Sequence, residues 1–118
     1  KGWGRIVNIS SIWGKISKEY RASYSSSKFA LDGMTLALTA EHAADGIIAN
    51  SIAPGFIDTE LTHKVLGEKR IKELTSLVPA QRLGHVDEIA RFVLWLSSED
   101  NTYVAGQNIS IDGGFSRV

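Results

Sequence analysis

Two short apolar runs flank a long periodic segment in the first half of the chain. The run RIVNIS at residues 5–10 is rich in β-branched side chains and too brief for a helix, so it predicts a buried strand. Residues 24–45 carry alanine, leucine, methionine and phenylalanine up to Gly46, which predicts a long helix that stops at a glycine with positive φ. The run IIANSIA at residues 47–53 predicts a second strand, closed by a Pro-Gly turn.

The second half of the chain continues this alternation after a weaker stretch. Residues 58–85 contain two amphipathic pieces, TELTHKVLG and EKRIKELTSL, which predict two short helices that form a lid over a site. Apolar positions on one face predict a helix at residues 87–98, and QNISIDGG at residues 107–114 predicts a third strand with a glycine turn. This order indicates an α/β fold in which right-handed crossovers join a parallel sheet. We expect residues 1–118 to form a single segment with one core.

Composition narrows the class of protein. The chain of 118 residues has 13 basic and 13 acidic residues mixed along its length, so nothing indicates a nucleic-acid or anionic-membrane partner. It contains no cysteine and no run of ~18 apolar residues that could span a bilayer, which favours a cytoplasmic enzyme or binding domain. The first residues, KGWGRIVNIS, lack methionine and lead into a strand almost at once, so we expect a segment of a longer chain.

Tyr24 and Lys28 are the first candidate catalytic pair. Residues at positions i and i+4 of a helix lie one above the other, so the phenol and the ammonium group can serve one site. A phenol has a pKa near ~10 and relays protons poorly at neutral pH unless a neighbouring positive charge, such as that of a lysine, favours the phenolate. Taken alone, the spacing also occurs in helices where a surface tyrosine ring packs on a lysine stem.

Other residues point to the same edge of the predicted sheet. Ser11 stands at the carboxyl end of the first strand, where open α/β sheets place their ligands, and its hydroxyl can donate to a substrate oxygen. Ser10 is the less favoured hydroxyl because neighbouring strand residues face opposite sides. The turn PGFIDT follows the second strand, so its backbone groups could face the same crevice. Trp13 could line this crevice or simply pack beside it.

With these spacings the chain resembles the classical short-chain dehydrogenase/reductase family over essentially its whole length. Four stretches fall in the family's order: GRIVNISSIWG, YSSSKFALDGMTLALTAEHAADGIIANSIAPGFIDT, RLGHVDEIARFVLWLSSE and YVAGQNISIDGG. The resemblance implies the C-terminal half of a Rossmann-like doubly wound parallel sheet. It also implies an oxidoreductase that uses NAD or NADP to reduce a ketone or oxidise a secondary alcohol. The pattern is similar to that of members that reduce 3-oxoacyl thioesters.

The same resemblance implies a role for each matching residue. Tyr24 matches the acid/base that exchanges a proton with the substrate oxygen. Lys28 matches the group that lowers the pKa of this tyrosine and binds the nicotinamide ribose, and Ser11 matches the hydroxyl that holds the substrate oxygen. The cofactor contacts that carry over lie in the turn after the second strand, at Pro54, Gly55, Ile57 (whose backbone matches the carboxamide site) and Thr59.

Two features limit what the resemblance implies. The family usually has a proline where this chain has Val86, which should alter only the start of a helix. The glycine-rich phosphate turn, the residue that selects NAD or NADP, and the asparagine of the catalytic set would all precede residue 1. Enoyl reductases of the family place six rather than three residues between the tyrosine and the lysine, so carbonyl or alcohol chemistry is favoured over double-bond reduction.

The remaining polar residues have structural interpretations. His42, His63 and His85 lie far apart in the sequence without a carboxylate or cysteine at ligand spacing, so we expect surface histidines and no metal site. Asn8 and Asn50 interrupt apolar strands. Buried amides at these positions would satisfy backbone groups rather than contact a substrate.

Two classes of function remain open. The first is an NAD(P)-dependent oxidoreductase acting on a small carbonyl or alcohol substrate, and the second is a non-catalytic assembly module or inactive segment without its cofactor-binding half. The helix at residues 24–45 carries apolar residues around its whole circumference, which predicts that a second subunit covers its outer face in a homodimer or homotetramer. The strand at residues 5–10 should expose an edge where a neighbouring strand would pair.

Overall fold

The computed structural model describes residues 2–118. Strands and helices follow the predicted order, and the boundaries differ from the predicted ones by a few residues. The elements are β1 (Gly4–Ile9), the 3-10 turn η1 (Ile12–Gly14), α1 (Ala22–His42), the 3-10 turn η2 (Ala43–Asp45), β2 (Ile47–Pro54), α2 (Glu60–Leu77), α3 (Val86–Leu96) and β3 (Asn108–Ile111). Within residues 2–118, none of the helices is long and apolar enough to cross a membrane.

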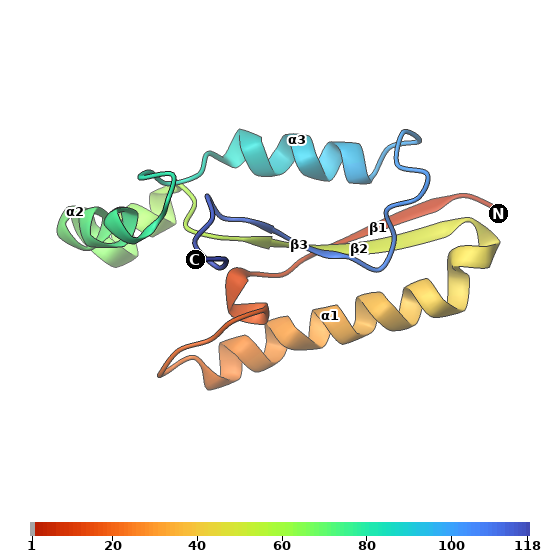
Figure 1. Ribbon diagram of the computed structural model, residues 1–118, viewed down its shortest axis with the longest axis horizontal. Coiled ribbons are helices and arrows are strands. Elements are labelled where there is room, and N and C mark those ends of the chain that lie inside the picture. The colour runs from red at the N-terminus through yellow and green to blue at the C-terminus, as the bar shows by residue number, and fades with distance from the viewer. Residues whose placement is uncertain (1) are drawn as a thin grey trace.

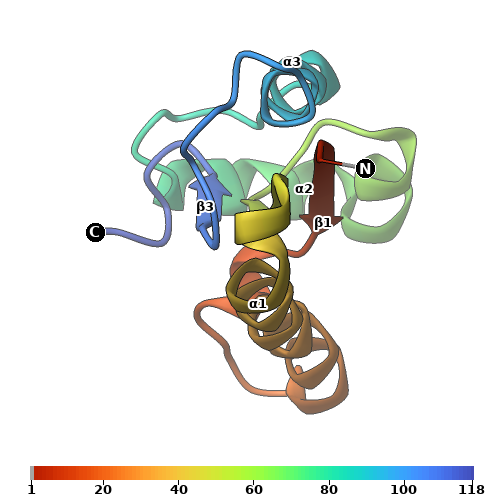
Figure 2. The same cartoon turned by 90° about the vertical axis from the view of Figure 1, so that its right-hand side faces the viewer.

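The strands form one parallel sheet of three strands in the order β1-β2-β3, so β2 is central. In its register, Ile9 of β1 lies opposite Ile52, and Ser51 lies opposite Asn108 of β3. Helix α1 covers one face of the sheet and α3 the other, while α2 lies beyond the carboxyl ends of the strands (Figure 1 and Figure 2). These layers confirm the expected α/β fold with a parallel sheet.

The buried core follows β2. Every residue of this strand from Ile48 to Ala53 is buried, and Leu96 of α3 and Ile12 of η1 are buried as well. A strand covered on both faces shows a continuous run of small and apolar residues rather than an alternating pattern. Full burial of one leucine or isoleucine stabilises the fold by about 1.5–3 kcal/mol. The core therefore fixes the position of β2, the strand from which the predicted cofactor turn emerges.

A polar layer lies between the sheet and α1. Thr35 Oγ1 is 2.6 Å from Ser51 Oγ, and Asn8 Nδ2 donates to the same threonine oxygen at 2.9 Å. The amide of Asn8 therefore meets a side chain, so the expectation that it satisfies a backbone group is wrong. The expectation holds for Asn50, whose Nδ2 donates to the Val104 carbonyl at 2.7 Å.

In the part of the chain that the structure describes, β1 is an edge strand, because it pairs with β2 alone. Trp3 and Ile9, which lie before and at the end of this strand, are 52% and 49% exposed. The prediction of an open edge at this strand is confirmed.

Helix α1 ends through η2 at Gly46. The α-helical hydrogen bonds stop at His42 and the last turn tightens into a 3-10 turn, which is a common way to satisfy terminal carbonyls. Gly46 has a φ of 80°, and its carbonyl accepts the N–H of Gly4 at 3.2 Å. The predicted glycine stop is confirmed, and it joins the end of the helix to the beginning of β1.

Helix α2 is interrupted at Gly67, whose φ of 71° and ψ of 163° are not helical, so it consists of two pieces as predicted. His63 lies just before the break, with Nε2 2.7 Å from Asp58 Oδ1 and Nδ1 3.0 Å from Glu68 Oε1. A neutral imidazole has one N–H, so only the protonated ring donates in both contacts. The two carboxylates lie on opposite sides of the ring, and residues 2–118 contain no group of three or more His, Cys, Asp or Glu that could hold a metal ion.

We expect the pKa of His63 to lie above its ordinary value of 6.5, because hydrogen bonds to Asp58 and then to Glu68 favour the protonated ring. A raised pKa in the folded state stabilises the fold fully below the unfolded value, and this contribution is lost as the pH rises through the folded pKa. NMR titration of the His63 ring protons measures the shift. Asp58→Asn and Glu68→Gln should each lower the value, whereas Glu60→Gln, which removes another carboxylate of the same helix, should leave it unchanged. A His63 pKa at or below 6.5 would contradict this assignment.

Candidate active site

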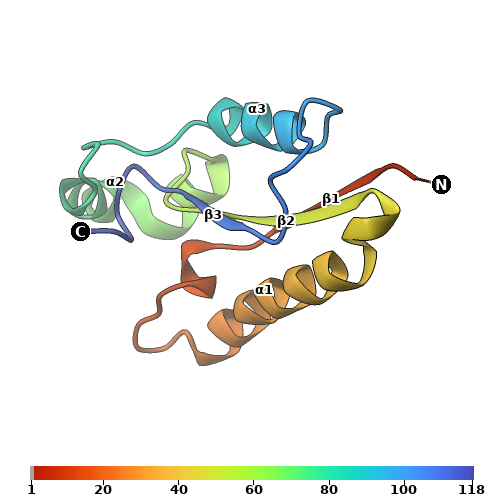
Figure 3. The same ribbon diagram turned by 45° about the vertical axis from the view of Figure 1, so that its right-hand side comes forward.

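The carboxyl ends of the strands meet at one end of the sheet, where η1, the start of α1 and the C-terminal segment also gather (Figure 3). Open parallel sheets bind their ligands at this end. Ser11 lies two residues after the end of β1, and the predicted cofactor turn begins at Pro54, the last residue of β2, so both emerge here. The structure therefore brings the predicted site segments to one edge.

Tyr24 and Lys28 share one face of α1, as their spacing predicts. The Nζ atom of Lys28 lies 5.7 Å from the centroid of the Tyr24 ring, and the ring is accessible because the residue is 45% exposed. The same ammonium group donates to the carbonyl of Ile9, the last residue of β1, at 3.0 Å. Lysine thus joins the helix of the tyrosine to the strand end that precedes Ser11.

Helix α1 approaches the chain after β1 very closely at Gly14. A Cβ at this position would lie 2.9 Å from both the carbonyl carbon and the Cβ of Lys28, which is too close for any residue except glycine. Beside it, the hydroxyl of Ser10 donates to the Lys28 carbonyl at 3.2 Å. Ser10 is therefore engaged with the helix, in keeping with the preference for its neighbour as the catalytic hydroxyl.

Ser11 caps η1. Its Oγ accepts the N–H of Trp13 at 3.2 Å, and the residue is buried. A hydroxyl has one hydrogen to donate and two lone pairs, so this contact orients the oxygen and leaves the hydrogen available for a substrate oxygen. The role that the resemblance implies for Ser11 is compatible with this geometry.

The turn after β2 presents its backbone in a defined direction. Ile57 forms a single parallel bridge with Gly84. In this bridge the N–H of Gly84 donates to the Phe56 carbonyl, and the N–H of Asp58 donates to the Gly84 carbonyl. The peptide groups of Ile57 itself therefore point away from Gly84. Its carbonyl accepts the hydroxyl of Thr62 at 2.7 Å. This orientation permits the carboxamide contact expected of the Ile57 backbone.

The other predicted cofactor residues also have local structural roles. Pro54 is the last residue of β2, and a Cβ on Gly55 would lie 2.7 Å from the Cβ of Asp112, so only glycine fits where the ends of β2 and β3 meet. Thr59 is the N-cap of α2, and its Oγ1 accepts the N–H of Thr62 at 3.1 Å. Its hydroxyl is thus already engaged, which sequence reasoning did not anticipate.

An aromatic cluster of Trp13, Phe56 and Phe115 joins the loops that follow the strands. The rings meet edge to face, with centroids 5.0 Å apart for the two phenylalanines and 6.3 and 6.4 Å from each of them to the tryptophan. The Nζ atom of Lys18 lies 5.4 Å from the tryptophan centroid on the solvent side. The sequence contained one signal for this cluster, since each phenylalanine directly follows a glycine turn at a strand end. Trp13 therefore packs against the two phenylalanines, which is one of the two roles considered for it from the sequence.

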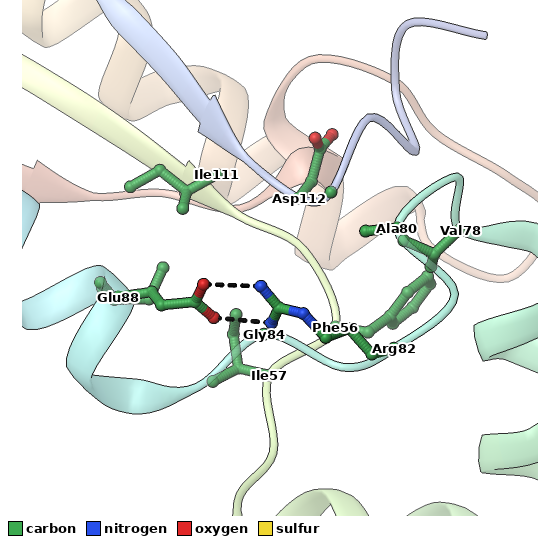
Figure 4. Close-up of a pocket in the computed structure, with 11 residues that line it drawn as sticks. Phe56, Ile57, Val78, Ala80, Arg82, Gly84, Glu88, Ile111 and Asp112 are labelled. Atoms are coloured by element: carbon green, nitrogen blue, oxygen red, sulfur yellow. Dashed lines mark hydrogen bonds and ion pairs between the residues drawn. The ribbon is translucent and has the colours of Figure 1, made fainter.

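A cavity of about 120 Å³ lies between Ile57, Ile111 and the start of α3 (Figure 4). Arg82 spans it and donates to both carboxylate oxygens of Glu88, at 2.8 Å each. Hydrogen bonds from Arg82 and from the backbone N–H of His85 lower the pKa of Glu88 to about 2. None of the three predicted catalytic residues lines this cavity, but Ile57 of the predicted cofactor turn does, so the cavity adjoins the candidate site on the side of that turn.

Comparison with known proteins identifies the family. The short-chain dehydrogenase family model described as enoyl-(acyl carrier protein) reductase matches residues 1–116. The chain belongs to the short-chain dehydrogenase/reductase family. Among curated relatives of this family, acetoacetyl-CoA reductase of Cupriavidus necator is 39% identical over 114 residues, which cover 97% of this chain and 46% of that protein. The 3-oxoacyl-(acyl-carrier-protein) reductase FabG of Pseudomonas aeruginosa is 39% identical over 112 residues, 95% of this chain and 45% of that protein.

Solved structures of short-chain dehydrogenases share the fold. A putative gluconate dehydrogenase from Agrobacterium tumefaciens matches with a TM-score of 0.92 at 34% identity, over 99% of this chain and 47% of that chain. A putative 2-deoxy-D-gluconate 3-dehydrogenase from the same organism, solved with bound NADP, matches with a TM-score of 0.90 at 37% identity, over 96% of this chain and 46% of that chain. The expected family and Rossmann-like sheet are confirmed, and the chain spans about half the length of the relatives it matches.

Proposed function

We propose that this chain is the catalytic half of an NAD(P)-dependent oxidoreductase that interconverts a ketone and a secondary alcohol, with 3-oxoacyl thioesters as the preferred substrate class. The observation that carries the proposal is the position of Lys28. Its ammonium group lies beside the Tyr24 ring and is bound to the carbonyl of Ile9 at the end of β1, two residues before Ser11. A proton donor, a cation and a second hydroxyl thus lie at the ligand-binding end of a parallel sheet.

Each of these side chains has a distinct task in carbonyl reduction. The Ser11 hydroxyl donates a hydrogen bond to the substrate oxygen, where negative charge develops. Tyr24 transfers its proton to that oxygen, and the positive charge of Lys28 stabilises the phenolate that remains. When bound, the nicotinamide supplies the hydride to the carbonyl carbon. In alcohol oxidation Tyr24 takes the proton back.

The turn after β2 is the proposed contact for the nicotinamide end of the cofactor. The peptide groups of Ile57 point away from their bridge partner and are directed for a carboxamide, with Pro54 and Gly55 shaping the turn. Thr59 Oγ1 accepts the N–H of Thr62, so its contact with an amide or phosphate oxygen of the cofactor would use the hydroxyl hydrogen, beside the first N–H groups of α2. Either NAD or NADP satisfies these contacts, and one structural relative was solved with NADP.

Carbonyl chemistry is favoured over double-bond reduction. The description of the matching family model names enoyl reductases, but this chain has three residues between Tyr24 and Lys28 rather than the six of that group. The two curated relatives described above are named for reduction of acetoacetyl and 3-oxoacyl groups. An assay of the complete protein with paired 3-oxoacyl and 2-enoyl thioesters separates the two reactions. Turnover of neither, with either cofactor, would favour the alternative of an assembly module.

Tyr24→Phe in the complete protein should lower turnover by ~10² or more, because it removes the proton donor, while cofactor affinity stays nearly unchanged. Lys28→Ala should weaken both turnover and cofactor binding. Steady-state kinetics and cofactor titration measure the two effects. Tyr20→Phe is the matched control, since that tyrosine is 95% exposed and its hydroxyl has no proposed task. A Tyr24→Phe variant that retains more than about a tenth of wild-type turnover would remove the catalytic assignment.

Purified residues 1–118 alone should show no carbonyl reduction and should bind NAD or NADP no more tightly than roughly millimolar, equivalent to about −4 kcal/mol. In dinucleotide-binding folds the pyrophosphate rests on a glycine turn and a helix N-terminus, which we place in the other half of the complete protein. Isothermal titration with each cofactor measures the affinity. Micromolar binding would show that this half holds a dinucleotide site of its own.

We propose that a second copy of the chain covers the outer face of α1. Phe29, Met34 and Leu36 on this helix are 46%, 44% and 53% exposed. Gly33 lies among them, and a Cβ there would have no neighbour within 4 Å. A glycine in a helix interior costs about 0.5–1 kcal/mol relative to alanine, and here it leaves space for close approach by another helix. These features support a homodimer or homotetramer.

Leu36→Glu should therefore shift the complete protein toward a smaller assembly, because it places a charge in an apolar contact. Val65→Glu on α2 is the matched control, since Val65 is 69% exposed but lies on a different helix. Light scattering at micromolar concentration gives the mass of each variant. A wild-type monomer, or equal dissociation by both substitutions, would count against assembly through α1.

A further inference from the structure

The first turn of α1 lacks the capping interactions that usually stabilise the start of a helix. Its N-cap residue, Arg21, makes no side-chain hydrogen bond to the helix, and the first turn contains no acidic residue. Capping side chains and negative charges are the common means of stabilising the free N–H groups at this end. Tyr24 lies in this turn, so the proposed proton donor stands on a part of the helix that should fray unless something else holds it.

Ser25 is the anchor of this turn. It is 6% exposed, whereas the residues on either side of it, from Ala22 to Ser27, are exposed. Its Oγ is 2.6 Å from the Oγ of Ser17, in the segment that leads from η1 to the helix. Ser26 and Ser27 behave differently, because their hydroxyls donate to carbonyls of their own helix at 2.7 Å. In the described chain, Ser25 is thus the serine of this turn that reaches another segment.

The segment between Ser17 and Ser25 holds a strained residue. Tyr20 has a φ of 61°, a left-handed conformation that is unfavourable for a bulky side chain, and it is 95% exposed. An exposed side chain makes few contacts that could impose this conformation, so the restraint comes from the ends of the segment. The hydroxyl pair closes the segment at those ends. This segment forms the second part of the connection between Ser11 and Tyr24.

We propose that the hydroxyl pair of Ser17 and Ser25 positions Tyr24 for proton transfer, an inference that rests on the proposed function. Ser25 follows the tyrosine directly, so its contact with Ser17 holds the turn at a fixed distance from the chain that bears Ser11. Lys28 is held separately, by the Ile9 carbonyl and by the close contact at Gly14. Loss of the pair therefore loosens Tyr24 without releasing the lysine. Both serines are positioning residues.

The test uses five variants of the complete protein: Ser17→Ala, Ser25→Ala, the double variant, Ser17→Thr, and Ser26→Ala as the matched control. Each single alanine at the pair should lower kcat about tenfold or more, with substrate KM and cofactor affinity within about twofold, because displacement of a reacting group by about 1 Å can cost 10²-fold in rate. The double variant should be no slower than the slower single variant, since both changes remove one interaction. Ser26→Ala should keep its rate, and Ser17→Thr, which retains the hydroxyl, should restore it.

Hydrogen exchange gives a readout that does not depend on activity. The amide of Ser25, which donates to the Arg21 carbonyl at 2.7 Å, should exchange faster in both single variants by the same factor, while amides near Thr35 stay protected. Rate losses that multiply in the double variant, or a loss in Ser26→Ala equal to that at the pair, would overturn the proposal. Unchanged kcat in Ser17→Ala and Ser25→Ala, together with an inactive Tyr24→Phe, would also overturn this proposal. That result would leave the proposed function intact. An active Tyr24→Phe with faster exchange in both variants would instead overturn the proposed function and retain the anchor.

Discussion

The contact between Lys28 and the end of β1 sets the geometry on which the candidate site depends. Three groups meet at this one position of α1: the ammonium binds the Ile9 carbonyl, the backbone carbonyl accepts the Ser10 hydroxyl, and Gly14 packs against the backbone itself. Together they restrain the helix both along its axis and toward the sheet. These three contacts set the distance of Tyr24 from the sheet and from the end of β1. A larger residue at position 14 would therefore displace the whole helix rather than one side chain.

The fully buried positions of α1 are polar, although the helix carries apolar residues around its whole circumference. Its buried residues are Ser25 and Thr35, while Phe29 and Leu36 are turned outward. Hydrogen bonds of this kind contribute about 1 kcal/mol each and depend on good geometry, whereas apolar burial is larger and tolerates small displacements. Hydrogen bonds therefore position the inner face of the helix, while several apolar side chains of its outer face stay exposed in the single chain.

The sequence predicted the elements well because their signals are local. Hydrophobic periodicity located the strands and helices, and Gly46 and Gly67 ended or broke helices as glycines do in left-handed or extended conformations. The pairing of Tyr24 with Lys28 could be predicted for the same reason, since one helical turn relates the two residues. The partners of Asn8, Ser25 and Thr59 could not, because hydroxyl and amide groups bind whichever polar atom the fold brings near, and no spacing along the chain encodes that choice.

The register of β1 on β2 has a consequence for the chemistry. Ile9 lies opposite Ile52, and the N–H of Ser10 continues the ladder by donating to the carbonyl of Ile52 at 2.8 Å. Because successive strand residues point to opposite faces, a slip of one residue would exchange the places of two adjacent serines. The hydroxyl that now binds the helix would turn to the ligand side, and the one beside it would be lost beneath the helix. The register of β1 therefore decides which of the two hydroxyls binds the helix, and the role that we propose for Ser11 depends on that register.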